Sequence, residues 1–114
     1  MSTPDDDAAR GRRRAEELVR LLTEDDAGAD ALLAELAGVR ELTFVGAGLT
    51  AIARAEGRLL PPAQRAQAST RQLRLGELRD ASRGDVDGLR TWLRRAGEEI
   101  LFIRSLRAAA DRMG

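Results

Sequence analysis

The chain has 114 residues, of which 43% are hydrophobic and 33% charged, and its 19 basic and 19 acidic residues give a formal net charge of zero. This length suits one domain with one core and leaves no room for two. Every basic residue is arginine, and the chain lacks lysine, histidine, cysteine, tyrosine and asparagine. A histidine or cysteine metal site, a thiol nucleophile and a histidine general base are therefore excluded, and we expect no metal, no cofactor and no catalytic residue.

Alanine and leucine dominate the hydrophobic residues, whereas β-branched and aromatic residues are few. Helices favour Ala, Leu, Arg and Glu, and strands favour β-branched and aromatic residues. The composition predicts an all-α fold in which residues 1–114 form a single domain, a small antiparallel bundle of about five helices. The longest nearly apolar run, 42–53, is shorter than the roughly 20 residues of a membrane-spanning helix. With no secretion signal visible, we expect a cytoplasmic protein without membrane contact.

The first two predicted helices occupy the N-terminal third of the chain. Thr3 followed by Pro4 and a run of aspartates is typical of a helix start, with Thr3 as the cap. Residues 1–11 are expected to fray. An acidic stretch with a glycine then breaks this helix, and a short second helix is expected near 29–37, with Gly38 as its C-terminal cap.

The third predicted helix, 40–56, is the most apolar segment of the chain. Leucine, valine and isoleucine recur at helical spacing on one side, and the other side carries Phe44 and small residues. A helix without a polar face is usually buried between other elements. Two leucines followed by two prolines, residues 59–62, then mark the clearest break in the chain.

The same segment contains a glycine pattern, GAGLTA from Gly46 to Ala51, that matches G-x-G-x-x-A of dinucleotide-binding sites. Such sites need a strand, a tight turn and a helix N-terminus that faces a pyrophosphate. Residues 42–45 could form the strand, but no second strand and no acid about twenty residues on follow. We favour a buried helix in which Gly46 and Gly48 allow a close crossing, and nucleotide binding is a minor alternative.

The middle of the chain has the poorest helical pattern. Residues 57–70 are predicted to be a weakly structured connection, and a helix over 63–83 is favoured mainly in its second half. Ser69 and Gln72 have the spacing of a capping box, which places a helix start there.

The last predicted helix is capped by Asp85 and runs to about Met113 with one broad apolar face. Residues 100–103 (ILFI) sweep about 300° around the helix axis, so Leu101 and Phe102 project away from the main stripe. Such a helix needs cover on nearly every side. Either it is the central helix, wrapped by the others, or it meets a second chain.

The acidic residues of this helix do not form a catalytic pair, because neighbours such as Glu98 and Glu99 point about 100° apart. Arg94 with Glu98, and Arg95 with Glu99, have the i,i+4 spacing of surface ion pairs. Glu99 also projects onto the apolar face. We favour a rim position for its side chain over a buried ion pair across helices or subunits.

Two segments thus need cover around their whole circumference, which one short chain supplies with difficulty. Burying Leu101 and Phe102 would be worth about 1.5–3 kcal/mol each, and exposing both would create an adhesive patch. We therefore expect a non-enzymatic helical interaction module, an adaptor or small subunit of a larger assembly. It would bind a protein partner or a second copy through Phe44, Leu101 and Phe102. A compact monomeric five-helix bundle is the competing interpretation.

Basic residues concentrate between Arg58 and Arg83, where six arginines and two acids give a net charge of +4. Arginine binds phosphates through two parallel hydrogen bonds, so the alternative function is a helical subunit that contacts nucleic acid. The candidate contacts are Arg65, Arg71, Arg74 and Arg79. Against this alternative, no aromatic residue is interleaved for base stacking, and the chain is neutral overall rather than basic.

Overall fold

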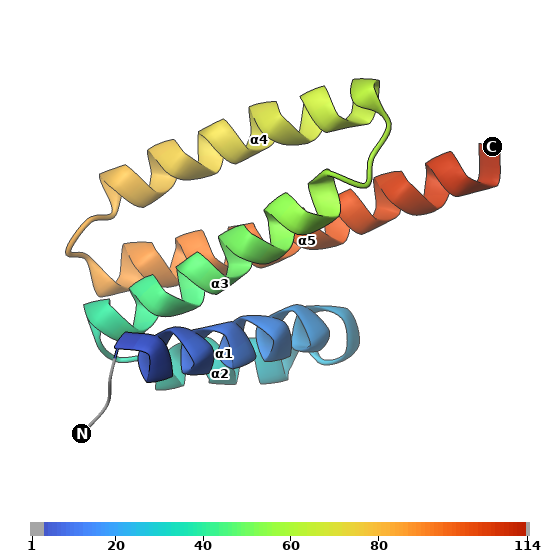
Figure 1. Ribbon diagram of the computed structural model, residues 1–114. Coiled ribbons are helices and arrows are strands. Elements are labelled where there is room, and N and C mark those ends of the chain that lie inside the picture. Colours follow the sequence, from blue (N-terminus) through green and yellow to red (C-terminus); the bar gives the residue numbers. More distant parts are fainter. Residues whose placement is uncertain (1–3, 114) are drawn as a thin grey trace.

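The computed structural model describes residues 4–113, which form α-helices and no strand (Figure 1). The helices are α1 (Pro4–Glu24), α2 (Asp26–Glu35), α3 (Val39–Gly57), α4 (Pro62–Ala81) and α5 (Val86–Met113). The predicted all-α bundle with a long last helix is confirmed. The expected cap at Thr3 lies outside the described residues.

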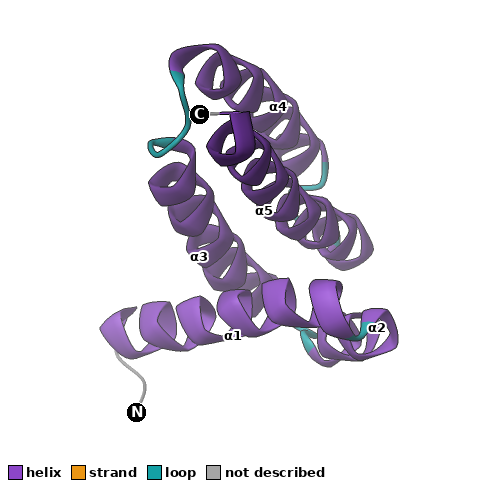
Figure 2. Cartoon of the chain, turned by 90° about the vertical axis from the view of Figure 1, so that its right-hand side faces the viewer, coloured by secondary structure: helices purple, strands orange, loops and turns teal. Residues whose placement is uncertain are grey.

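α5 is the central helix of the bundle, because each of the other described helices packs against it. Figure 2 shows α1 and α2 on one side of α5 and α4 on the opposite side, with α3 between them. Leu89, Trp92, Leu93, Ile100 and Ile103 form most of its buried face. The last helix is therefore wrapped by its own chain, which is the first of the two arrangements that its sequence allows.

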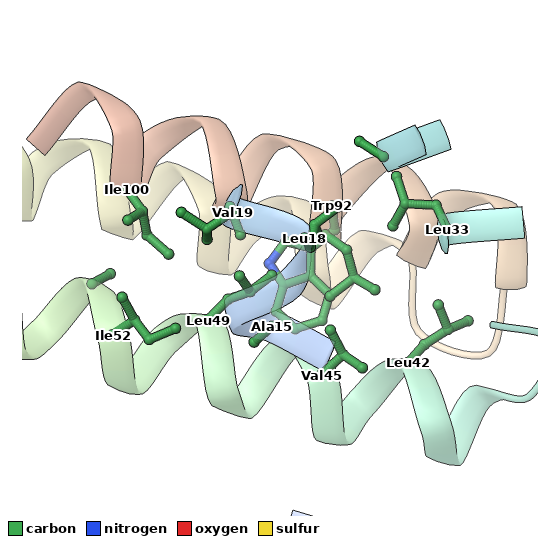
Figure 3. Close-up of a cluster of buried hydrophobic side chains, with 14 of the residues drawn as sticks. Ala15, Leu18, Val19, Leu33, Leu42, Val45, Leu49, Ile52, Trp92 and Ile100 are labelled. Atoms are coloured by element: carbon green, nitrogen blue, oxygen red, sulfur yellow. The ribbon is translucent and has the colours of Figure 1, made fainter. Parts of the chain in front are cut away.

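The hydrophobic core lies where α1, α3 and α5 meet (Figure 3). The side chains that meet there include Ala15, Leu18 and Val19 of α1, Val45, Leu49 and Ile52 of α3, and Trp92 and Ile100 of α5. α1 and α3 share the most extensive contact in the chain. The apolar stripe that predicts the third helix is thus the stripe that faces this core.

Two glycines let α3 approach its neighbours closely. A Cβ atom on Gly46 would overlap the ring of Trp92, and one on Gly48 would lie 2.9 Å from the Cβ of Ala15. α3 is a continuous helix through both positions. The interpretation of these glycines as helix-packing residues is confirmed, because helix stands where a dinucleotide site needs a strand and a turn.

α4 differs most from its prediction. It begins at Pro62, so most of the expected connection over 57–70 is helical, and Ser69 lies inside the helix instead of capping it. A proline in the first turn has a φ angle that already suits a helix, which explains the start at Pro62. Packing against α5 supplies the order that the sequence pattern of α4 lacks.

The two remaining cap predictions have opposite outcomes. Gly38 does not cap α2, because α2 ends with Leu36 in the cap position and Gly38 precedes the first residue of α3. Asp85 does cap α5, since its Oδ1 accepts a hydrogen bond from the backbone N–H of Asp87 at 3.2 Å. The turn before it uses Gly84 at a φ of +81°, a left-handed conformation that glycine adopts without strain.

We predict that Gly46→Ala lowers the free energy of unfolding by about 1–3 kcal/mol or more, because the new methyl group must displace the Trp92 ring. Gly76→Ala is the matched control: a Cβ there would have nothing within 4 Å. It should raise stability by up to about 1 kcal/mol, since alanine favours helix over glycine. Urea unfolding measures both changes. Equal stability of Gly46→Ala and the unsubstituted chain would contradict the close crossing of α3 and α5.

Candidate functional site

The three residues predicted to anchor a partner are partly covered by their own chain, with Phe44 on α3 and both Leu101 and Phe102 on α5. Phe44, on α3, lies beside Gly11 of α1, and the guanidinium of Arg40 is 5.5 Å from the centre of its ring. Leu101 packs against the core. The ring of Phe102 lies beneath α4, 4.0 Å from the guanidinium carbon of one of its arginines. Each of the three therefore already has contacts within its own chain.

The arginine above Phe102 is Arg71, and it also joins α4 to α5 through Glu99. Arg71 Nε donates hydrogen bonds to the two carboxylate oxygens of Glu99 at 2.9 and 2.7 Å. The Glu99 side chain is only 12% exposed. These hydrogen bonds raise the pKa of Arg71 above its ordinary value by more than burial lowers it. Glu99 thus combines the two predicted arrangements: it forms an ion pair across helices within one chain, and this pair is only partly buried.

Two arginines of α5 bind α2 and α3. Arg94 contacts Asp26 and Asp30 of α2, and the hydrogen bond to Asp26 is the main cause of its raised pKa. Arg104 pairs with Glu56 of α3 at 2.8 Å. The predicted i,i+4 pairs along α5 are therefore replaced, at Arg94 and at Glu99, by contacts to other helices. Sequence spacing cannot reveal such partners.

Arg90 makes the third of these contacts. Its Nε donates to the carbonyl oxygens of Leu33 and Leu36 at 3.0 and 3.2 Å. Those carbonyls lie at the C-terminal end of α2, where helix carbonyls lack partners within the helix. Arg90 thus caps α2 in place of the glycine that the sequence suggests.

The four arginines proposed to contact nucleic acid do not form one basic surface. Arg65 donates to the Leu60 carbonyl at 3.0 Å, Arg71 binds Glu99, and Arg79 lies 3.4 Å from a carboxylate oxygen of Asp80. A groove between α2, α4 and α5 contains Arg71 and Arg74, whereas Arg65 and Arg79 line the opposite side of α4. The four arginines therefore lie on two sides of α4.

The side of α4 that faces α3 lines a groove whose floor is formed by core residues. α3 and α4 contact each other only slightly and leave between them a groove of about 820 Å³, hereafter the α3–α4 groove. Its apolar lining comes from Leu49 and Ala53 of α3 and from Trp92, Ala96 and Ile103 of α5. The groove therefore reaches the edge of the core.

The α4 side of this groove is poorly covered. Of α4's residues, all within the described part of the chain, only Ala68 is buried, and Leu73 is 72% exposed. The position of a Cβ on Gly76 has nothing within 4 Å. Gln72 Nε2 is buried without a hydrogen-bond partner, and such a group costs about 1–3 kcal/mol. α4 thus presents an edge that its own chain leaves incomplete.

Charges of opposite sign line the two ends of the α3–α4 groove. Arg54, Arg58 and Arg65 line the end where α3 passes into α4, whereas Glu77, Asp80 and Arg79 line the end toward the C-terminus of α4. Asp80 pairs with the arginines on either side of it. Within residues 4–113, neither Arg54, Arg58 nor Glu77 forms a salt bridge. The groove therefore offers free charges as well as apolar surface.

Sequence reasoning missed this groove. One signal was present: Leu73, Leu75 and Leu78 do not share a clean helical stripe. The structure gives the reason, since Leu75 and Leu78 pack against the core and Leu73 does not. Leu73, which lies off the stripe that faces the core, therefore marks the side of α4 that its own chain leaves exposed.

Comparisons of this chain with protein-family models, curated proteins and solved structures found no match. No helix in the described range is long and apolar enough to cross a bilayer. The same residues contain no group of three or more acidic side chains placed to hold a metal ion. The geometry of the chain is thus the basis for its functional assignment.

We predict that Arg71→Ala loosens α4 without disturbing the rest of the bundle. It removes the ion pair with Glu99 and the stacking on Phe102, and solvent exposure of Arg71 limits the expected loss to about 1–2 kcal/mol. Native-state hydrogen exchange should show faster exchange over α4 and unchanged exchange in α1 and α3. Arg74→Ala, which removes an arginine one turn away, is the control. Equal exchange in the two variants would contradict the role of Arg71.

Proposed function

We propose that this chain is a non-enzymatic helical interaction module, an adaptor or small subunit of a larger assembly, that binds protein in the α3–α4 groove. The observation that carries the proposal is the groove itself, with its apolar lining and the 72% exposed Leu73 on its edge. The other large apolar residues of the lining are core or half-buried side chains, so Leu73 is the apolar side chain that a partner would cover. A cytoplasmic location stays part of the proposal.

The shape of the groove favours a helix as its occupant. Its walls are two long helices of 19 and 20 residues, and small residues face it from both. These small residues are Thr50, Ala53 and Gly57 on α3 and Ser69 and Gly76 on α4. An amphipathic helix binds such a groove with its apolar side, and small residues let the two backbones come close.

The proposed anchor differs from those that the sequence suggests. Phe102 is already stacked against Arg71 and Leu101 packs on the core, so neither needs a partner for cover. Leu73 does, because 72% of it is exposed. The nucleic-acid alternative has less support, since three of its four arginines already hydrogen-bond within the chain.

The proposal is tested by photocrosslinking in the cells that make this protein. A photoreactive amino acid replaces Leu73 or Ser69 in the groove, and Ala31, exposed on α2, carries it in the control. We expect both groove positions to crosslink to the same helical segment of one protein, identified by mass spectrometry, and the control to give none of it.

If neither groove position forms an adduct that the control lacks, the proposal is wrong. Adducts with unrelated proteins at the two groove positions would also count against it, since one docking site holds one partner surface at a time.

A further inference from the structure

We propose that the occupant of the α3–α4 groove is a second copy of this chain, bound antiparallel about a two-fold axis near Leu73. The inference rests on the proposed function and specifies its partner. It is carried by the distribution of charge along the groove, by the shape of its edge and by the net charge of the chain.

The order of charges along the groove is self-complementary. The end at the α3–α4 connection carries Arg54 and Arg58, and the other end carries Glu77. In a two-fold pair, if residue i of one copy contacts residue j of the other, then j also contacts i. An antiparallel pair therefore places the arginines of each copy beside Glu77 of the other, at both ends of the contact.

The same distribution disfavours other occupants. A uniformly acidic helix would meet Glu77 at one end, where Asp80 is already paired with arginines, and a uniformly basic helix would meet Arg54, Arg58 and Arg65 at the other. Like charges placed together at an interface suppress binding. The groove therefore suits a surface with acidic residues opposite its arginines and basic residues opposite Glu77. A second copy bound antiparallel has its charges in this order by symmetry.

The edge of α4 also has complementary shape. Leu73 projects with 72% of its surface exposed, and Gly76, three residues on and thus on the same side of the helix, has open space where a side chain would be. In an antiparallel crossing, Leu73 of each copy would fit beside Gly76 of the other. This contact buries the most exposed leucine of the described chain.

Overall charge does not oppose this association. The chain carries 19 basic and 19 acidic residues, so two copies do not repel each other over the whole surface. A net charge near zero favours association, whereas a large net charge keeps copies apart.

Charge reversal tests the geometry directly. Multi-angle light scattering of the purified full chain should give a concentration-dependent mass that approaches twice the 12.4 kDa of one chain. The double reversal Arg54→Glu with Arg58→Glu places acids together at both ends of the pair, and Glu77→Arg places arginines together there. Each variant alone should lose association by at least about tenfold, because two attractions become repulsions.

Mixing the two variants provides the decisive measurement. In a mixed pair, the two new glutamates of one copy lie beside the new arginine of the other, and the unchanged Arg54 and Arg58 lie beside the unchanged Glu77. Both ends are then attractive, so an equimolar mixture should regain the dimer mass. Arg13→Glu, an exposed reversal on α1, is the matched control and should remain dimeric.

A second variant guards against effects on folding. Leu73→Asp changes an exposed side chain, so the chain should keep its helical circular dichroism and its cooperative unfolding and become monomeric. A dimer that survives Leu73→Asp, or charge-reversal variants that each dimerise alone like the unsubstituted chain, would overturn the inference.

Failure of this inference can be told apart from failure of the proposed function. A chain that is monomeric at every concentration, but whose groove crosslinks to a helix of a different protein in cells, refutes the second copy and leaves the interaction module in place. A monomer whose groove forms no adduct refutes both.

Discussion

The long helix α5 needs cover on nearly every side, and the bundle is arranged to supply it. Four helices pack around it, and glycines make the closest crossings possible: Gly46 of α3 receives the Trp92 ring, and Gly97 of α5 receives Leu22 of α1. On its polar flanks, Arg94 and Arg104 bind α2 and α3, and Glu99 binds Arg71 of α4. α5 is therefore the helix that all the others contact, while α1 packs chiefly on α3.

The position of α4 follows from this arrangement. α1, α2 and α3 cover the other sides of α5, so α4 packs chiefly on α5 and touches α3 only slightly. Arg71, Glu99 and Phe102 hold it there. A partly buried ion pair of this kind adds little net stability, but it can fix the register of two helices. The α3–α4 groove exists because α4 is held by one neighbour instead of two.

The residues that support association with a partner are consequently on α4 and no longer on α5. The run of apolar residues at 100–103 shows how much cover that part of α5 needs, and its own chain gives most of it. Leu73 and the groove beside it are what the chain leaves open. Hydrophobic periodicity shows which side of a helix must be buried, but it does not show which other element buries it.

Local features of this protein were determined by the sequence alone: the all-α class, the long final helix, the cap at Asp85 and the packing role of Gly46. Each depends on propensity or spacing over a few residues, which a sequence displays directly. The partner of Glu99, the start of α4 and the groove were decided only by the tertiary structure. They depend on contacts between segments far apart in the chain, such as Arg71 with Glu99, and the order of residues alone does not specify which distant side chains meet.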